Sequence, residues 1–221
     1  NISPLSTFPT LEPTWTRNTS YVKKYGAESF MSMEDIKTAD IDVIARTLLR
    51  LTRAVVKQVD TDIWNVMTEN QTPVNIQTFA TTAVGGDQWD AASYAADIVA
   101  DLMNAEKLIW EQSYDPEGAT LYLSPKDYTS VVNWLISGKG SSIPNFSSEK
   151  VRTGIVMTLL GLNIKVSNNV TADNAAVVVP QRACTWRSHT DTTSRAIEEA
   201  GIGTKLRVWE LGIATLTDPK A

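Results

Sequence analysis

The sequence predicts an α+β fold, because its helical patterns lie in the first two thirds of the chain and its strand patterns dominate the last third. The strongest helical pattern covers residues 39–67, and two more follow before residue 137. The regular strand–helix alternation of a doubly wound sheet is absent. With 221 residues and 43% hydrophobic content, the chain can bury a core in one large domain or two small ones.

The N-terminal segment, residues 1–38, has an irregular pattern. Its prolines keep the chain extended and prevent helix formation. The aromatic and charged stretch from Trp15 to Phe30 predicts a two-stranded hairpin that turns at Gly26. Because an isolated hairpin is only marginally stable in water, we expect it to lie on another surface.

Residues 39–67 predict one helix of about 28 residues, roughly 42 Å long. Apolar side chains recur at spacings of three and four along it, which is typical of one buried face. Asp40 and Asp42 stand at its N-terminal end, where the helix dipole favours anions. A second stripe is basic and consists of Arg46, Arg50, Arg53 and Lys57. This stripe is either a solvated face or an ion-pairing surface between subunits.

The middle of the chain predicts a strand within residues 68–87 and a second helix from about residue 88 to 113. We expect Trp89, Ile109 and Trp110 on the buried side of this helix. Its acidic face, the expected counterpart of the basic stripe, consists of Asp90, Asp97, Asp101 and Glu111. A short strand, Leu121–Leu123, then leads into a third helix that Ser124 caps and Pro125 begins.

The last part of the chain predicts mainly strands, after a loop rich in Gly, Ser and Pro at residues 137–150. One short helix is predicted at residues 194–200, followed by a turn at 201–205. In the stretch LLGLNIKVSNNV the alternation predicts a strand with Leu162, Ile164 and Val166 facing the core. The polar residues 167–169 that follow predict a turn.

Charge is segregated along the chain, whose formal net charge is −5. Residues 61–120 hold ten acids and one base, and the remainder holds fifteen acids and nineteen bases. Binding to a nucleic-acid backbone needs clustered cations, so this distribution argues against a protein that grips nucleic acid broadly. The segregated charges suit acidic and basic surfaces that meet between copies of the chain. They suit equally two faces that are only solvated.

No catalytic, cofactor-binding or metal-binding constellation is evident in the sequence. His189 is the single histidine and Cys184 the single cysteine, which excludes a multi-histidine or cysteine-rich metal site. We therefore expect no enzyme, no cofactor and no metal. Four glycosylation triplets occur, at Asn18, Asn70, Asn145 and Asn169, but no signal peptide pattern accompanies them. No apolar run is long enough to span a membrane.

The order of elements resembles that of the major capsid proteins of tailed double-stranded DNA phages, the Hong Kong 97-like fold. The resemblance rests on SPKDYTSVVNWL, a Gly/Ser-rich loop, LLGLNIKVSNNV, AAVVVPQRACTW and KLRVWELGIATLTDPKA, preceded by an extended arm, a hairpin and a long helix. It implies an N-terminal arm at 1–14, the family's E-loop hairpin at 15–38, a peripheral domain with its spine helix at 39–75 and 176–221, and an axial domain at 76–175.

The resemblance further implies a structural protein that assembles with itself into pentamers and hexamers of an icosahedral shell in the virion. Scaffold, portal and decoration proteins are its implied partners, and the shell would enclose double-stranded DNA without sequence-specific binding. The absence of an initiator Met fits removal of a scaffold segment or a trimmed sequence equally well. The interface residues we expect are Trp15, Arg17, Tyr21, Lys23, Lys24, Tyr25, Arg46, Arg50, Arg53, Lys57, Asp97 and Asp101.

Some members of this family crosslink an E-loop lysine to an asparagine near the C-terminus. Lys23 and Lys24 could supply the amine here, but no asparagine follows Asn174. We therefore expect a shell held by non-covalent contacts. An encapsulin-type nanocompartment shell, with the same fold, stays open as an alternative, as does a secreted surface or carbohydrate-binding domain.

Overall fold

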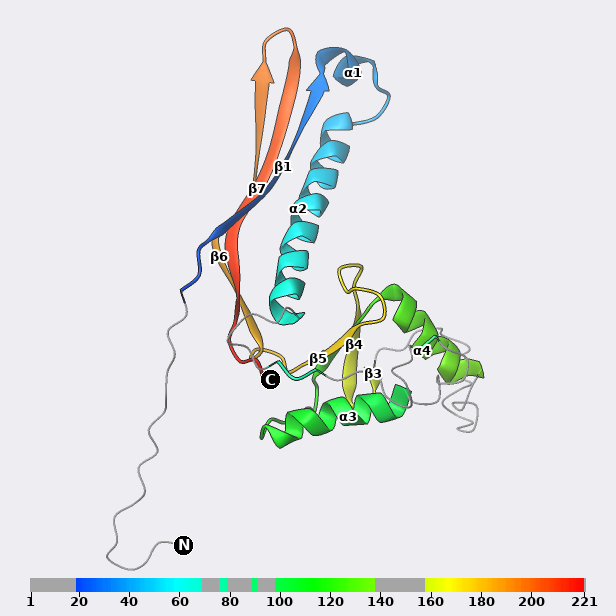
Figure 1. Ribbon diagram of the computed structural model, residues 1–221. Helices are drawn as coiled ribbons and strands as arrows, with labels where there is room; N and C mark the ends of the chain where they lie inside the picture. Colours follow the sequence, from blue (N-terminus) through cyan, green and yellow to red (C-terminus); the bar gives the residue numbers. More distant parts are fainter. Residues whose placement is uncertain (1–18, 69–75, 79–88, 91–97, 138–157, 221) are drawn as a thin grey trace, which may run out of the picture.

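The computed structural model describes residues 19–68, 76–78, 89–90, 98–137 and 158–220. The architecture is α+β, as predicted, and has a long lobe and a smaller lobe (Figure 1). The long lobe consists of β1 (Lys23–Ser32), α1 (Met33–Thr38), α2 (Val43–Thr68), β6 (Cys184–Glu199) and β7 (Gly203–Leu216). The smaller lobe consists of α3 (Ile98–Glu111), β2 (Thr120–Leu123), α4 (Pro125–Ser137), β3 (Thr158–Leu159), β4 (Leu162–Val166) and β5 (Ala175–Val178).

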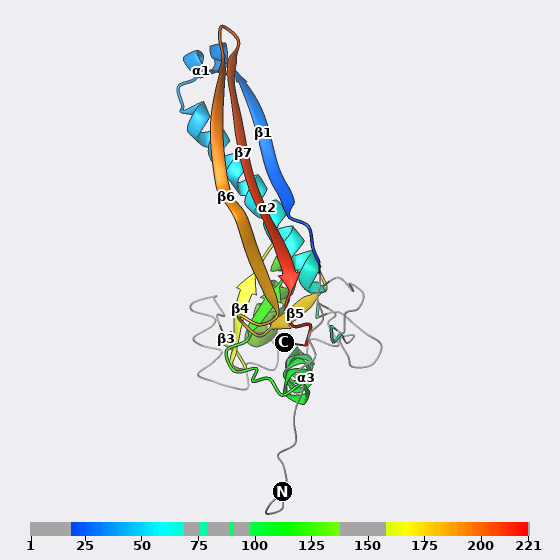
Figure 2. The same cartoon turned by 90° about the vertical axis from the view of Figure 1, so that its left-hand side faces the viewer.

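The sheet of the long lobe is antiparallel, and its central strand is β7 (Figure 2). β1 pairs with β7 over its whole length, from Lys23 opposite Gly212 to Ser32 opposite Gly203. The predicted hairpin between residues 15 and 30 is therefore wrong for the described part, residues 19–30. Gly26 continues the strand opposite Trp209, because the apolar alternation of β1 finds its partner near the other end of the chain.

Helix α2 covers one face of this sheet, and the predicted long helix is confirmed with a later start. The chain bends at residues 40–41, and Asp42 caps the helix by accepting a hydrogen bond from the Ala45 N–H at 2.9 Å. Apolar side chains from three elements form the core of the lobe, because α2 presents its apolar stripe to alternate residues of the strands. Its buried members are Met31, Leu51, Val55, Leu206 and Val208.

Strand β6 runs through residues 194–199, so the short helix predicted there is wrong. Ala, Arg and Glu favour helix locally, but the ladder with β7 satisfies the backbone of this segment and overrides that preference. The turn predicted at 201–205 is confirmed only for residues 201–202, because β7 begins at Gly203. Gly201 has a φ of +76°, and the Ile202 N–H donates to the Glu199 carbonyl at 3.0 Å.

The smaller lobe contains a sheet of order β3-β4-β2-β5, in which β2 is parallel to β4 and antiparallel to β5. Its core joins α3 and α4 to this sheet. The fully or almost fully buried members include Ile98, Leu102, Leu121, Leu123 and Leu162. Helix α4 starts as predicted: the Asp127 N–H donates to Ser124 Oγ at 3.2 Å, with Pro125 as the first helical residue.

Strand β4 matches its prediction only in part. Leu162 is buried and Ile164 half-buried, whereas Val166 is 45% exposed, because the strand leaves the core before it ends. The predicted turn after it is confirmed by a hydrogen bond from the Val170 N–H to the Ser167 carbonyl at 3.3 Å. Some predictions lie outside the described residues. They are those for 1–18, for most of the 68–87 and 137–150 segments, and for 151–157. No helix in the described ranges is long and apolar enough to cross a membrane.

Candidate subunit interface

The basic stripe of α2 faces away from the sheet. Leu51 and Val55 point into the core, and at 100° per residue the four cations of the stripe lie on the opposite side of the helix. Arg46, Arg50, Arg53 and Lys57 are all exposed. None of them forms an ion pair or hydrogen bond with any residue that the structure describes. Among the described residues the stripe is therefore a cationic surface without an ion-pairing acid, and no acid occurs between Asp42 and Asp60 in the sequence.

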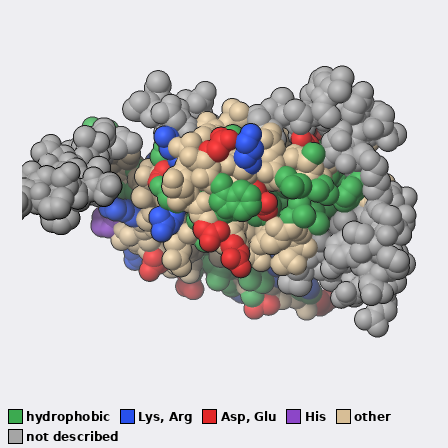
Figure 3. Space-filling model, turned by 90° about the horizontal axis from the view of Figure 1, so that it is seen from below, with side chains coloured by type: hydrophobic (Ala, Val, Ile, Leu, Met, Phe, Trp, Pro, Cys, Tyr) green, Lys and Arg blue, Asp and Glu red, His purple; other side chains and the backbone are tan. Residues whose placement is uncertain are grey.

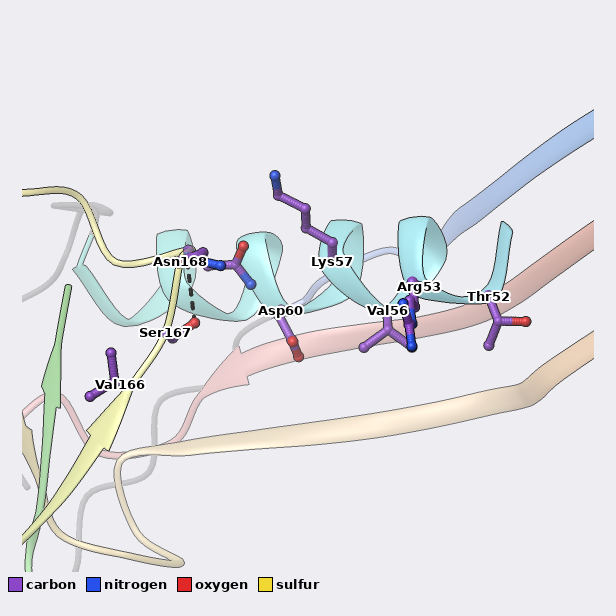
Figure 4. Close-up of a pocket in the computed structure, with 9 residues that line it drawn as sticks. Thr52, Arg53, Val56, Lys57, Asp60, Val166, Ser167 and Asn168 are labelled. Atoms are coloured by element: carbon purple, nitrogen blue, oxygen red, sulfur yellow. Dashed lines mark hydrogen bonds between the residues drawn. The ribbon is translucent and has the colours of Figure 1, made fainter. Parts of the chain in front are cut away.

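A groove of about 430 Å³ lies between α2 and the turn that follows β4. Figure 4 shows its two walls: residues from successive turns of α2 on one side, and the end of β4 with its turn on the other. The Asn169 N–H donates to Ser167 Oγ at 3.2 Å and holds the turn in place. The groove combines two exposed valines with two cations, and its lining consists of Thr52, Arg53, Val56, Lys57, Asp60 and Val166–Asn169.

Lys23 and Tyr25, two of the predicted interface residues, have partners within the subunit. Lys23 Nζ lies 2.6 Å from Asp62 Oδ1, and the Tyr25 hydroxyl donates to Asp62 Oδ2 at 2.7 Å. The ring of Tyr25 also packs on Trp186, with 6.0 Å between the ring centroids. Burial, together with the Asp62 carboxylate, raises the pKa of Tyr25 well above its usual value. These contacts fasten β1 to the sheet-facing side of α2.

Other residues of the predicted set are available to a neighbour or lie outside the described ranges. Tyr21 is 86% exposed, and Lys24 is exposed and forms no ion pair within the described part of the chain. Trp15 and Arg17 fall in residues 1–18, which are not described.

The prediction of an exposed acidic face on the second helix is wrong for Asp101. Asp101 is only 3% exposed and accepts a hydrogen bond from Trp89 Nε1 at 2.9 Å, so it belongs to the core of its own subunit. Asp90 lies 3.0 Å from Lys126, which also contacts Asp173 at 2.7 Å. Glu111 lies 3.5 Å from Lys107 on the same helix. Asp97 lies outside the described residues.

Trp110 of α3 is 60% exposed, although its helical spacing predicted burial. Met103 on the same helix is also exposed. Seen from below, this side of the molecule shows hydrophobic side chains next to acidic ones (Figure 3). Met103 and Trp110 thus give α3 a surface with apolar side chains that the described part of its lobe leaves exposed.

An acidic corner that the sequence analysis overlooked lies at the far end of the long lobe, where α1 leads into α2 (Figure 1). Residues 34–42 hold four acids and one base. Glu34, Asp35 and Asp40 are exposed, and their carboxylates have no partner among the described residues. This cluster of acids is visible in the sequence, but we assigned Asp40 and Asp42 only to the dipole of the long helix.

His189 and Cys184 belong to no catalytic arrangement among the described residues. His189 is exposed on β6, and the neighbouring Ser188 donates its hydroxyl to Asp191 at 2.7 Å instead of to the imidazole. Cys184 is half-buried at the start of β6, and burial raises the pKa of its thiol, which keeps the thiol in its unreactive protonated form. Within the described ranges no three potential ligands cluster around a metal position.

Comparison with known proteins assigns the family. The model of one protein family, described as phage capsid protein, matches residues 17–221. The chain belongs to the phage capsid protein family. No curated protein sequence matches this capsid protein. It is a structural protein of a phage capsid shell, located in the virion.

Solved structures share the fold of the capsid protein at low sequence identity. A chain of Mycobacterium phage Che8 is 17% identical, with a TM-score of 0.70 over 90% of this chain and 68% of that one. The capsid of cyanophage P-SCSP1u gives 15% identity and a TM-score of 0.60 over 98% and 79%. A virus-like particle from Pyrococcus furiosus is 15% identical, with a TM-score of 0.62 over 91% of this chain and 75% of that one. The capsid protein therefore has the Hong Kong 97-like fold.

Proposed function

We propose that copies of this capsid protein assemble with one another into pentamers and hexamers of an icosahedral shell that encloses double-stranded DNA. The observation that carries the proposal is the uncompensated surface of the single subunit: four cations on α2 without partners among the described residues, and large apolar side chains left exposed. Contacts between unlike surfaces of identical subunits close into rings, and rings can build a shell.

The domain division proposed from the resemblance needs two changes. The arm at 1–14 keeps its boundaries, whereas the axial domain, expected at 76–175, extends to Val178 because β5 pairs with β2. The peripheral domain, expected at 39–75 and 176–221, starts again after β5 and is extended toward the N-terminus. We place β1 and α1 with the peripheral domain, because β1 is an integral strand of its sheet. The interface then includes the basic stripe of α2, together with Trp15, Arg17, Tyr21 and Lys24.

Scaffold, portal and decoration proteins are the further partners we propose, and DNA is enclosed without sequence-specific contacts. The shell is held by non-covalent contacts. The phage capsid family match favours this role over a nanocompartment shell, although the virus-like particle from Pyrococcus furiosus has the same fold.

Electron microscopy of the expressed protein tests the proposal. We expect hollow icosahedral particles or capsomer rings, and we expect boiling in SDS to release single chains of 24.3 kDa. A protein that stays a 24.3 kDa monomer at all concentrations in light scattering would overturn the assembly proposal. Particles whose subunits stay joined after boiling under reducing conditions would overturn the non-covalent part alone.

A further inference from the structure

We propose that the segment Asp40–Asp42 of one subunit docks into the groove between α2 and the β4 turn of a neighbouring subunit. This contact rests on the proposed self-assembly and names the two surfaces that would meet in it. The groove is defined by the lining residues given above, and the occupant is a second copy of this chain.

The docking segment combines an apolar side chain with negative charge on both sides. Ile41 is 49% exposed between Asp40 and Asp42, at the bend where α1 leads into α2. Asp42 uses one oxygen to cap α2, whereas the Asp40 carboxylate has no partner in the described part of the chain. This bend lies at the far end of the long lobe (Figure 1), so the exposed Ile41 and its neighbouring carboxylates are accessible there.

The groove has the complementary chemistry, because its lining holds two cations against one acid, Asp60, next to apolar side chains. Val56 and Val166 are 44% and 45% exposed and offer an apolar surface to Ile41. Arg53 and Lys57 line the same groove and offer cations to the flanking carboxylates. Since neither cation has a partner within the described residues, an incoming acid breaks no described ion pair when it binds.

The contact has to form between subunits. Val43 and Val56 stand on one continuous helix, and thirteen residues of helix at 1.5 Å each separate them by about 20 Å. The corner of a subunit thus cannot reach its own groove. Every copy carries one corner and one groove, so the contact is heterologous and repeats around a ring.

The acids that the sequence analysis assigned to this role are poorly placed for it. Asp101 is buried, and Asp90 and Glu111 already pair with lysines of their own lobe. Among the described residues, the corner at 34–42 combines exposed carboxylates that lack partners with an exposed apolar side chain.

Disulfide trapping tests the geometry. The variant Cys184→Ala, Ile41→Cys, Val56→Cys has one thiol on each surface, about 20 Å apart within a chain, which is too far for an intrachain bond. We expect mild oxidation of assembled particles to give a ladder of multimers on non-reducing SDS gels. The matched control replaces Ile41→Cys by Glu117→Cys, an exposed position between α3 and β2, and we expect it to give single chains.

Charge exchange tests the energetics. We expect Asp40→Arg alone, or Arg53→Glu alone, to lower the particle yield about tenfold or more, because the lost contact repeats at every subunit. Both changes in one chain restore opposite charges across the contact and should recover most of the yield. The control Arg187→Glu makes the same charge change at another exposed site and should assemble normally.

The outcomes separate this inference from the proposed function. If the unchanged chain forms no particles or rings, the assembly proposal is wrong. If it assembles but the paired cysteines give no ladder, or the double charge exchange recovers nothing while circular dichroism shows folded chains, the docking contact alone is wrong.

Discussion

Trp186 lies directly over Gly212 on the α2 side of the long sheet. A Cβ on Gly212 would stand 2.3 Å from Cζ2 of the indole, so no other residue fits there without displacing the ring. The ring also touches Tyr25, which in turn bonds Asp62 of α2. The absence of a side chain at Gly212 thus leaves room for the contacts that join β6, β1 and α2.

We predict that Gly212→Ala lowers the free energy of unfolding by about 1–3 kcal/mol, the usual cost of overpacking. Urea unfolding of the dissociated subunit measures it. In a Trp186→Ala background the same substitution should cost much less, because the clashing ring is gone. Equal costs in both backgrounds would show that the indole is not what excludes a side chain at Gly212.

Tyr25 gives the fold a dependence on alkaline pH. Its pKa is raised in the folded subunit, chiefly by burial and then by Asp62, so the folded state holds the proton more tightly than the unfolded chain does. Stability should therefore fall as the pH rises above about 10, the ordinary value for tyrosine. We predict that Tyr25→Phe removes part of this fall, measured as the melting temperature between pH 8 and 11. An unchanged slope would contradict this assignment.

At the scale of elements, α4 depends on a reciprocal cap. Ser124 Oγ accepts from the Asp127 N–H and donates to Asp127 Oδ2 at 2.7 Å, and the same carboxylate accepts from the Asp173 N–H at 3.1 Å. The cap therefore joins the start of α4 to the segment that leads into β5. Next to it, hydrogen bonds to Asp173 and Asp90 raise the pKa of Lys126.

We predict that Ser124→Ala destabilises the subunit by about 1–2 kcal/mol, because a buried N–H and a buried carboxylate each lose a partner. Ser130→Ala, at a half-buried position of the same helix outside the cap, is the matched control and should change stability by less than about 0.5 kcal/mol. Chemical denaturation of both variants measures the difference, and equal effects would speak against the cap.

Elements that are determined by neighbouring residues in the sequence could be predicted. Elements that depend on pairing with a distant segment could not. The apolar stripe of α2 and the Ser124–Pro125 start of α4 carry their own signals. The pairing of β1 with β7 leaves no local mark, so its alternation was mistaken for a hairpin. The basic stripe could also be predicted, because its four cations recur at helical spacing within one segment. The burial of Asp101 could not, because it depends on Trp89, twelve residues away.

At the scale of the whole molecule, the subunit has two separate hydrophobic cores. One lies between α2 and the long sheet, and the other joins α3 and α4 to the small sheet. The two clusters have no residue in common. Each lobe can therefore lose packing without disturbing the core of the other.

We predict that Leu206→Ala and Leu121→Ala each cost about 2–5 kcal/mol, and that their costs add, since the sites share no neighbour in either cluster. Hydrogen exchange followed by mass spectrometry should show faster exchange in the long lobe for Leu206→Ala and in the smaller lobe for Leu121→Ala. Loss of protection across both lobes in either variant would mean that they unfold as one unit.

The central position of β7 also sets when the protein becomes competent for its role. β7 is synthesised long after β1, and it joins β1 through pairs such as Arg207 with Glu28, which are 179 residues apart. During synthesis, β1 and the apolar side of α2 have no sheet to join until β7 has left the ribosome. The appearance of β7 therefore acts as a checkpoint, and a chain that terminates before β7 lacks the strand that it needs to join a shell.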